Sequence, residues 1–282
     1  MKKILITGLH GFIGKHLYRS ISKFDFELIN YAKDVDLRSA ESFLKFPKVD
    51  FIVHLAAKSF VPEAFENPFN IYSNNINITL NVLEKARKDA AHVIFLSTYV
   101  YGEPKYLPID EIHVIAPQNP YTHSKLICES LFEAYYRDFS VSSTIFRPFN
   151  IYGPGQNLSF LIPTLFSQNR TSLIKLKDPR PKRDFIYVQD VVDAIILSIT
   201  NFGHGVNIFN LGSGNSISIG ELCSIIKDLT QSNAIIEFSN EFRKGEVLET
   251  VANWSKFSNH SGWKPKIALR DGLSFYFSQI DA

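Results

Sequence analysis

The chain has 282 residues, of which 45% are hydrophobic and 21% charged, as expected for a globular protein with a large core. A net charge of +2 without a long basic run argues against a nucleic-acid-binding surface. Two cysteines, Cys128 and Cys223, are too few for a disulfide framework, and no apolar run resembles a membrane span or a complete signal peptide. We therefore expect a soluble, cytoplasmic protein without nucleic-acid or membrane partners.

The first half of the chain alternates short apolar runs with helical patterns. Residues 3–7 predict a buried strand, and the recurrence of Ile13, Leu17 and Ile21 predicts a helix over 11–24. The same reasoning predicts strands at 26–32, 50–56, 93–97 and 143–147, and helices at 40–46, 70–88 and 121–139. Strands and helices in this rhythm build a parallel sheet covered on both faces. The expected fold is therefore α/β, with a doubly wound sheet of the Rossmann type.

The rhythm breaks after Asn150, where glycine and proline separate shorter segments. A strand and helix over 183–200 are expected to return to the first lobe. We predict a dinucleotide-binding domain from residues 1–150 with 183–207. Residues 151–182 with 208–282 should form a smaller C-terminal α/β lobe that binds the substrate.

Three glycines, Gly8, Gly11 and Gly14, stand between the first strand and the first helix. Gly8 permits a tight turn, Gly11 lets the backbone approach a pyrophosphate, and Gly14 lets the helix pack closely on the sheet. The phosphates would lie on free N–H groups at the helix N-terminus. The motif therefore predicts a dinucleotide site.

The end of the second strand carries no carboxylate to accept a hydrogen bond from an adenosine ribose. Lys33 could instead neutralise a 2′-phosphate, which slightly favours NADP over NAD. An ordinary surface charge explains Lys33 equally well, so the cofactor is predicted as NAD(P).

Tyr121 and Lys125 are four residues apart in a predicted helix and so share a face. A nearby ammonium stabilises a phenolate and prepares the tyrosine for proton transfer. Ser97 and Thr98 follow a sheet strand, at the edge where open α/β sheets bind ligands. These side chains are our candidate catalytic group.

These motifs resemble the extended short-chain dehydrogenases that act on nucleotide sugars, the NAD-dependent epimerase/dehydratase family. The resemblance covers nearly the whole chain. It rests on the glycine turn, the pair Tyr121 and Lys125, and segments 36–37, 50–57, 74–79, 97–102, 147–154, 183–190, 243–247 and 262–265.

The resemblance implies a role for each matching residue. Tyr121 would be the acid/base and Lys125 would also hold the nicotinamide ribose. Ser97 best fits the catalytic hydroxyl, with Thr98 as the alternative if the strand end is shifted by one residue. Other expected cofactor contacts are Gly8, Gly11, Phe12, Ile13, Gly14, Asp36, Leu37, Leu55, Ala56, Ala57 and Asn74. Asn150, Arg183 and Arg243 would bind the diphosphate of a nucleoside-diphosphate sugar; no metal ligand is assigned.

Several reactions share this machinery. Dehydratases place an acidic pair after the catalytic hydroxyl, where this chain has Thr98 and Tyr99, so dehydration is not expected. The shortness of the chain and the lack of a carboxylate at the end of the second strand favour a reductase. Such an enzyme uses NAD(P)H to reduce C4 of a 4-keto-6-deoxy nucleoside-diphosphate sugar, as in deoxysugar synthesis for surface polysaccharides. A nucleotide-sugar 4-epimerase stays open. A catalytically inactive cofactor-sensing protein is a remote third reading, because Tyr121 and Lys125 are intact.

The predicted helices at 70–88 and 121–139 resemble those through which family members form homodimers. Leu126, Leu131, Phe132 and Tyr135 are candidates for such a face, although packing within one subunit explains them equally well.

Overall fold

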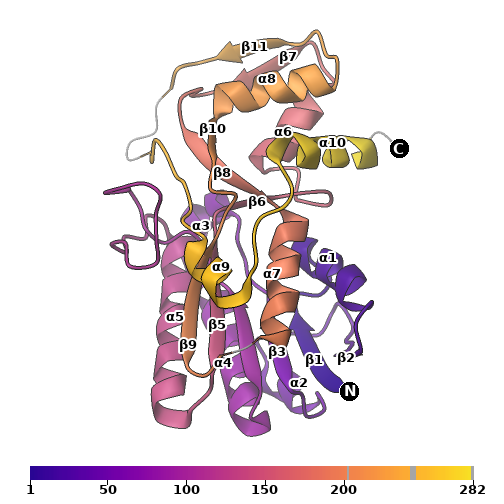
Figure 1. Cartoon of the computed structure of the whole chain (residues 1–282), viewed down its shortest axis with the longest axis vertical. Helices are drawn as coiled ribbons and strands as arrows, with labels where there is room; N and C mark the ends of the chain where they lie inside the picture. Colours follow the sequence, from indigo (N-terminus) through magenta and orange to yellow (C-terminus); the bar gives the residue numbers. More distant parts are fainter. Residues whose placement is uncertain (202, 242–245, 281–282) are drawn as a thin grey trace.

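The computed structural model describes residues 1–201, 203–241 and 246–280. Its larger lobe is built on a six-stranded parallel sheet with strand order β2-β1-β3-β4-β5-β9 (Figure 1). The strands are β1 (Lys2–Thr7), β2 (Phe26–Ile29), β3 (Phe51–His54), β4 (His92–Leu96), β5 (Ser143–Pro148) and β9 (Val206–Leu211). The order reverses between β1 and β3, which places a ligand-binding crevice at their carboxyl ends.

Helices cover both faces of this sheet. The helices of the larger lobe are α1 (Phe12–Ile21), α2 (Ala40–Leu44), α3 (Val61–Glu66), α4 (Pro68–Asp89), α5 (Pro120–Phe139), α7 (Val188–Thr200) and α9 (Ser255–Ser261). Successive residues of β1 enter different cores, because strand side chains alternate between faces. Ile4 and Ile6 pack with α1 and α7, whereas Leu5 packs with α4 and α5. The sheet is therefore doubly wound, as predicted.

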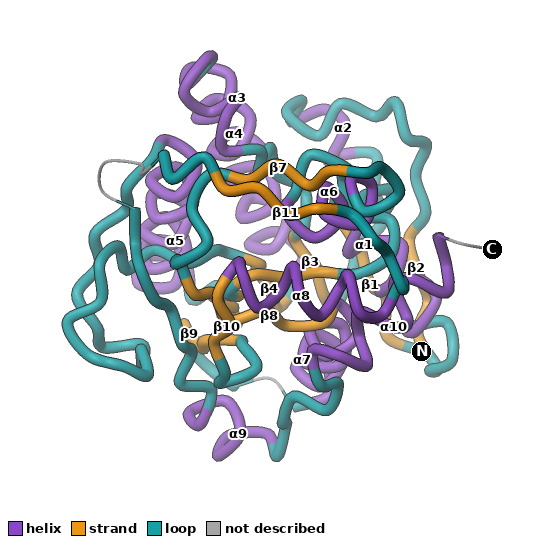
Figure 2. The backbone as a smooth tube through the Cα atoms, turned by 90° about the horizontal axis from the view of Figure 1, so that it is seen from above, coloured by secondary structure: helices purple, strands orange, loops and turns teal. Residues whose placement is uncertain are grey.

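The smaller lobe lies above the carboxyl edge of the large sheet (Figure 1). It contains a three-stranded sheet of order β10-β8-β6, made by β6 (Asn150–Tyr152), β8 (Lys182–Tyr187) and β10 (Ser216–Ser218). Figure 2 shows β7 (Leu173–Leu176) and β11 (Ile235–Phe238) side by side above it. The helices of this lobe are α6 (Leu161–Gln168), α8 (Ile219–Leu229) and α10 (Leu269–Ile280), and they share one apolar core with its strands.

The segment 183–200 is divided between the lobes. Its helix, α7, packs against α1 in the larger lobe, whereas its strand, β8, pairs with β6 and β10 in the smaller sheet. The strand β9 lies wholly in the large sheet and crosses the predicted break after residue 207. The division into two ligand-binding domains itself stays a prediction.

Residues of α5 that were candidates for a dimer face lie mostly inward. Phe132 is fully buried in the core beneath α4 and α5, so it cannot line an interface. Leu131 and Tyr135 pack against the same core while partly buried, and Leu126 packs against a separate cluster. Among the described helices, none is both long and apolar enough to cross a membrane.

Candidate functional site

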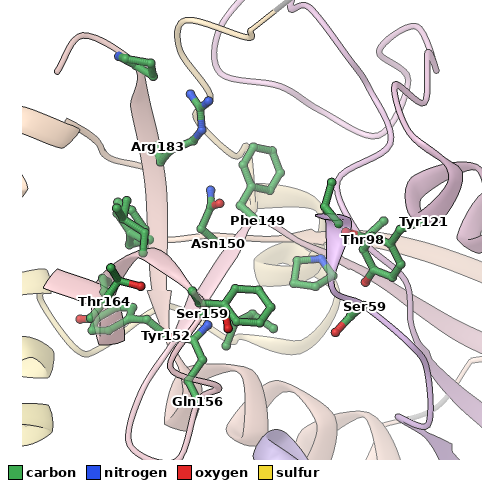
Figure 3. A pocket seen from close by; sticks show the side chains of 18 of the residues that line it. Ser59, Thr98, Tyr121, Phe149, Asn150, Tyr152, Gln156, Ser159, Thr164 and Arg183 are labelled. Carbon is green, nitrogen blue, oxygen red and sulfur yellow. Dashed lines mark hydrogen bonds between the residues drawn. The ribbon is translucent and has the colours of Figure 1, made fainter. Parts of the chain in front are cut away.

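A cavity of about 720 Å³ lies where the carboxyl edge of the large sheet faces the smaller lobe (Figure 3). Segments that are distant in the sequence contribute to its lining. The predicted site residues among them are Phe12, Ile13, Leu55, Ala57, Ser97, Thr98, Tyr121, Lys125, Asn150 and Arg183. The fold thus brings the expected catalytic side chains and several expected ligand contacts into one space.

The three glycines of the first turn have different surroundings. Gly8 has a φ of +77°, and a Cβ there would lie 2.7 Å from the Ala56 nitrogen. A Cβ on Gly14 would lie 2.2 Å from the Gly8 oxygen, whereas one on Gly11 would meet only that oxygen, at 3.2 Å. No side chain caps the N-terminus of α1. The Gly11 N–H donates to the Gly8 carbonyl at 2.9 Å, so the N–H groups of the first turn of α1 are the ones open to a pyrophosphate.

The end of β2 is tied to the glycine turn by Tyr31. Its hydroxyl accepts a hydrogen bond from the Gly8 N–H at 2.9 Å, and its carbonyl is hydrogen-bonded to Nε2 of His10 at 3.1 Å. Burial raises the pKa of Tyr31. Lys33, the residue proposed to neutralise the 2′-phosphate of NADP, follows Tyr31 by two residues and is exposed.

Besides Gly8, Gly11, Gly14 and Ala56, three further expected cofactor contacts lie outside the lining of the cavity. Asp36 forms an exposed ion pair with Arg38, and the carbonyl of the buried Leu37 accepts a hydrogen bond from Asn81. Asn74 is partly buried, and its side chain donates to Asn75. Their contact with a cofactor stays a prediction.

The start of α5 positions the candidate catalytic pair. Asn119 and Thr122 form a capping box around Pro120, which fixes Tyr121 and Lys125 on the first turns of the helix. The Lys125 ammonium lies 4.2 Å from the centre of the Phe95 ring. Burial lowers the pKa of Lys125 to about 8. Near pH 7 this side chain therefore still carries its charge.

Burial acts on Tyr121 in the opposite sense. It raises the pKa of the phenol to about 12, although a hydrogen bond with Thr98 partly offsets the effect. Figure 3 shows Thr98 and Tyr121 side by side at the cavity wall. A phenol in this state keeps its proton near neutral pH and can act as an acid.

The two strand-end hydroxyls face different partners. The Ser97 hydroxyl donates to the buried Glu129 carboxylate at 2.5 Å. Glu129 in turn forms a buried ion pair with Arg147 at 2.6 Å. Thr98, the residue expected only if the strand end is shifted by one position, is the one beside Tyr121. Both residues line the cavity, and which of the two is the catalytic hydroxyl stays a prediction.

The expected diphosphate contacts line the other side of the cavity. Asn150 donates to the Asp184 carbonyl at 3.1 Å. Arg183 forms an ion pair with Glu246 and donates to the Val247 carbonyl at 2.7 Å. Arg243 lies outside the described residues. In the absence of an anion, the carboxylate of Glu246 thus neutralises the guanidinium of Arg183.

Sequence reasoning missed the inward-facing Asn75, which is 1% exposed. It shares the helical face of Ile71, Ile78 and Val82, so its period in α4 was a usable signal. It also missed Ser59, for which no motif gave a signal. The sequence indicated of Tyr99 only that it stands where a dehydratase has an acidic residue. In the structure its hydroxyl donates to the Gly102 carbonyl, and its ring packs edge-on against Phe149.

The chain is similar to proteins of known family over most of its length. Residues 4–212 match the model of the NAD dependent epimerase/dehydratase family. A putative UDP-glucose 4-epimerase of Methanocaldococcus jannaschii is 32% identical, covering 96% of this chain and 95% of the relative. The GDP-6-deoxy-D-mannose reductase of Pseudomonas aeruginosa is also 32% identical, covering 100% of this chain and 98% of the relative.

Solved structures agree with this relationship. The structure of RMD from Pseudomonas aeruginosa complexed with NADPH has a TM-score of 0.92 at 29% identity, covering 99% of this chain and 98% of the other. UDP-glucose 4-epimerase from Thermotoga maritima with UDP-glucose has a TM-score of 0.91 at 26% identity, and both chains are covered completely, at 100%. The chain therefore belongs to the NAD dependent epimerase/dehydratase family and is an NAD(P)-dependent oxidoreductase of that family.

Proposed function

We propose that this protein uses NAD(P)H to reduce C4 of a 4-keto-6-deoxy nucleoside-diphosphate sugar, within deoxysugar synthesis. The observation that carries the proposal is that Thr98, Tyr121 and Lys125 line one cavity, with the Tyr121 phenol hydrogen-bonded with Thr98. A ketone that becomes an alcohol needs a proton donor at its oxygen, and this group supplies one. The similarity to a GDP-6-deoxy-D-mannose reductase also supports it.

The chain's own residues act in a defined order. When bound, the nicotinamide supplies the hydride. Tyr121 gives its phenolic proton to the oxygen at C4, and Thr98 holds that oxygen by its hydroxyl. The Lys125 ammonium stabilises the phenolate that Tyr121 becomes, until solvent returns the proton. General-acid assistance of this kind contributes roughly 10²- to 10⁴-fold in rate.

The other residues of the site would bind the two diphosphate groups, that of the cofactor and that of the substrate. The first turn of α1 would hold the cofactor pyrophosphate, because its N–H groups and the helix dipole favour an anion, and Gly11 would let the phosphates approach the backbone. Arg183 and Asn150 would hold the substrate diphosphate at the opposite wall. Diphosphate binding at Arg183 has to displace or share the Glu246 carboxylate. NADP is slightly favoured over NAD, on Lys33 and the missing carboxylate at the end of β2.

A 4-epimerase is the second candidate, supported by the similarity to the Methanocaldococcus jannaschii protein. The purified protein is mixed with NADPH or NADH and a panel of 4-keto sugar nucleotides, and the absorbance of the reduced nicotinamide is followed. We expect absorbance loss with at least one member. Interconversion of 4-epimers without added reductant, and no reduction of any ketone, would replace the reductase by the epimerase.

Tyr121→Phe separates an enzyme from a cofactor-sensing protein. The variant lacks the proton but keeps the ring, so we expect turnover to fall by about 10²-fold or more while NAD(P)H still binds. Unchanged turnover of every active substrate would remove Tyr121 from the mechanism.

A further inference from the structure

A buried ion pair joins the catalytic helix to the central sheet. The carboxylate of Glu129 on α5 lies 2.6 Å from the guanidinium of Arg147 on β5, and each residue is 2% exposed. The Nε of Arg147 also donates to both oxygens of this carboxylate, at 3.1 Å each. Replacing such a pair by apolar residues often leaves stability unchanged or improves it, so stability alone is a weak reason for its presence.

The Glu129 carboxylate is directed towards the catalytic group. Glu129 follows Lys125 by four residues in α5, the spacing at which helical side chains are neighbours. Its Oε1 accepts a hydrogen bond from the Ser97 hydroxyl at 2.5 Å, and Ser97 lines the cavity. One carboxylate therefore contacts the strand-end hydroxyl and lies one helical turn from the ammonium of Lys125.

The guanidinium of Arg147 is held by the sheet rather than by the helix. Its Nη1 donates to the Tyr101 hydroxyl at 3.0 Å, and that hydroxyl donates to Oδ1 of Asn210 on β9 at 2.6 Å. Tyr101 and Asn210 are both 0% exposed. A cation that is fixed by buried hydrogen bonds cannot move away from Glu129 when the charge of its partner changes.

Among the described residues that act on Lys125, only Glu129 is negatively charged near pH 8. Burial lowers the pKa of Lys125, while the side chains of Cys128 and Glu129 raise it. Burial also raises the pKa of the Cys128 thiol and brings the pKa of the Tyr121 phenol to about 12, so both keep their protons. On β3, burial and the Lys125 charge hold the pKa of His54 well below its usual range, so the imidazole is neutral.

We propose that Glu129 is a positioning residue of the catalytic group, and that Arg147 moderates its negative charge. The carboxylate holds the Ser97 hydroxyl at the cavity wall and keeps the Lys125 ammonium charged, whereas the guanidinium opposes that second effect. The proposal rests on the proposed function in taking Lys125 as the charged member of the site. Removal of the carboxylate and removal of the guanidinium should therefore move the titration of Lys125 in opposite directions.

Glu129→Gln and Arg147→Met each remove one charge. Lys125 is charged below its pKa and neutral above it, so kcat/KM of the wild type should fall above about pH 8. In Glu129→Gln the ammonium loses its anion and meets an unpaired guanidinium, so the fall should begin about one pH unit lower. In Arg147→Met the carboxylate acts unopposed, so the fall should begin at higher pH. Shifts in the same direction, or no shift in either folded variant, would overturn the proposal.

Two further variants separate this electrostatic effect from a loss of stability. Asp89→Asn breaks another buried ion pair, in which Nζ of Lys85 lies 2.5 Å from the Asp89 carboxylate in the last turn of α4. It should lower the melting temperature without moving the pH profile, and a moved profile would assign the effect to stability. Glu129→Asp keeps the negative charge, so its profile should lie near that of the wild type even where kcat drops. If Glu129→Gln does not fold, Arg147→Met decides alone, and a profile at or below the wild-type position overturns the proposal.

The Kd for NAD(P)H over the same pH range separates this inference from the proposed function. Lys125 is expected to contact the nicotinamide ribose, so binding should weaken above its pKa and shift in the two variants as the rate does. A wild-type protein that reduces no ketone, with these opposite shifts in Kd, would sink the reductase alone. A wild-type protein that reduces a ketone, with Glu129→Gln and Arg147→Met following its pH profile, would sink the role of Glu129 alone.

Discussion

Burial acts on the two catalytic side chains of α5 in opposite directions. It favours the neutral form of each, so it lowers the pKa of Lys125 to about 8 and raises that of Tyr121 to about 12. Between these values the phenol is protonated while the ammonium is being lost. A proton-donating tyrosine is therefore available over a wide pH range, but its charged neighbour is not.

This difference predicts the pH dependence of reduction. Lys125 is charged below its pKa of about 8 and neutral above it, so kcat/KM should be flat near neutrality and fall above about pH 8. Steady-state rates over pH 6–10 with one active ketone measure this profile. In Lys125→Arg the cation persists at every accessible pH, so the fall should disappear, although the rate itself drops. The same fall in that variant would assign it to another group.

Thr98 and Ser97 form a matched pair of hydroxyl deletions. Thr98→Val keeps the shape but removes the hydroxyl beside Tyr121, so we expect kcat to fall by about 10²-fold. Ser97→Ala removes a hydrogen bond to the buried Glu129 carboxylate, so the free energy of unfolding should fall by about 1–3 kcal/mol. Its kcat should change by less than about threefold. Urea unfolding and steady-state kinetics measure both, and the reverse pattern would return the catalytic role to Ser97.

At the scale of elements, the turn between β1 and α1 separates packing from ligand binding. A Cβ on Gly14 would meet the backbone of Gly8 and Leu9 at 2.2–2.8 Å, whereas one on Gly11 would meet only the Gly8 oxygen, at 3.2 Å. Both glycines belong to one motif in the sequence, where their roles were assigned from the general geometry of a dinucleotide-binding turn. The contacts of an added Cβ show which one the fold itself requires.

Alanine at each position tests this separation. Gly14→Ala forces a Cβ to within 2.2 Å of a backbone oxygen, so we expect a loss of about 1–3 kcal/mol in the free energy of unfolding. Gly11→Ala should lose less, about 1 kcal/mol, because its Cβ would meet one backbone oxygen at 3.2 Å, which a small shift relieves. It should nevertheless weaken NAD(P)H binding by about tenfold, roughly 1.4 kcal/mol. Cofactor titration measures the Kd for NAD(P)H, and urea unfolding measures the free energy of unfolding. A Gly11→Ala variant that binds NAD(P)H as tightly as the wild type would contradict the contact between Gly11 and the pyrophosphate.

At the scale of the whole molecule, the fold could be predicted because its signals are local. Buried parallel strands read as apolar runs, and the glycine turn and the Tyr121–Lys125 spacing each lie within one element junction. The details that escaped prediction depend on other elements. The turn after β4 determines which hydroxyl lies beside Tyr121. The strand β8 lies in the smaller sheet, and not with the first lobe as expected, because it pairs with β6 and β10.

The helical period of Asn75 indicates that its side chain faces inward, but its hydrogen-bond partners could not be predicted from its own segment. Its partners come from the β3–α3 loop and from α5, so their contact exists only once the sheet has assembled. The ion pair of Arg183 with Glu246 likewise joins residues 63 positions apart. Sequence motifs thus predicted which residues line the site, whereas their hydrogen bonds and ion pairs depend on the tertiary structure.

The outer face of α4 and α5 is the surface on which we expect a homodimer to form. The Tyr72 hydroxyl is hydrogen-bonded to Nδ1 of His123 at 2.9 Å, which marks where the two helices meet on the exposed side. Ile76 and Ile127, each four residues further along its helix, are only partly buried. A pair of long helices that leaves partly buried isoleucines on its outer side is suited to an isologous contact with a second copy.

Ile127→Arg tests this face. A guanidinium placed in an apolar isologous contact meets its own symmetry mate, so we expect the variant to sediment as a monomer where the wild type has twice that mass. Ile235→Arg is the matched control, because Ile235 is 64% exposed on β11 in the other lobe. It should leave the assembly unchanged. Since Tyr121 and Lys125 lie on the same helix, the monomer should bind NAD(P)H but lose part of its turnover. A wild-type protein that is monomeric at all concentrations would refute the dimer, and a dimeric Ile127→Arg would move it to another surface.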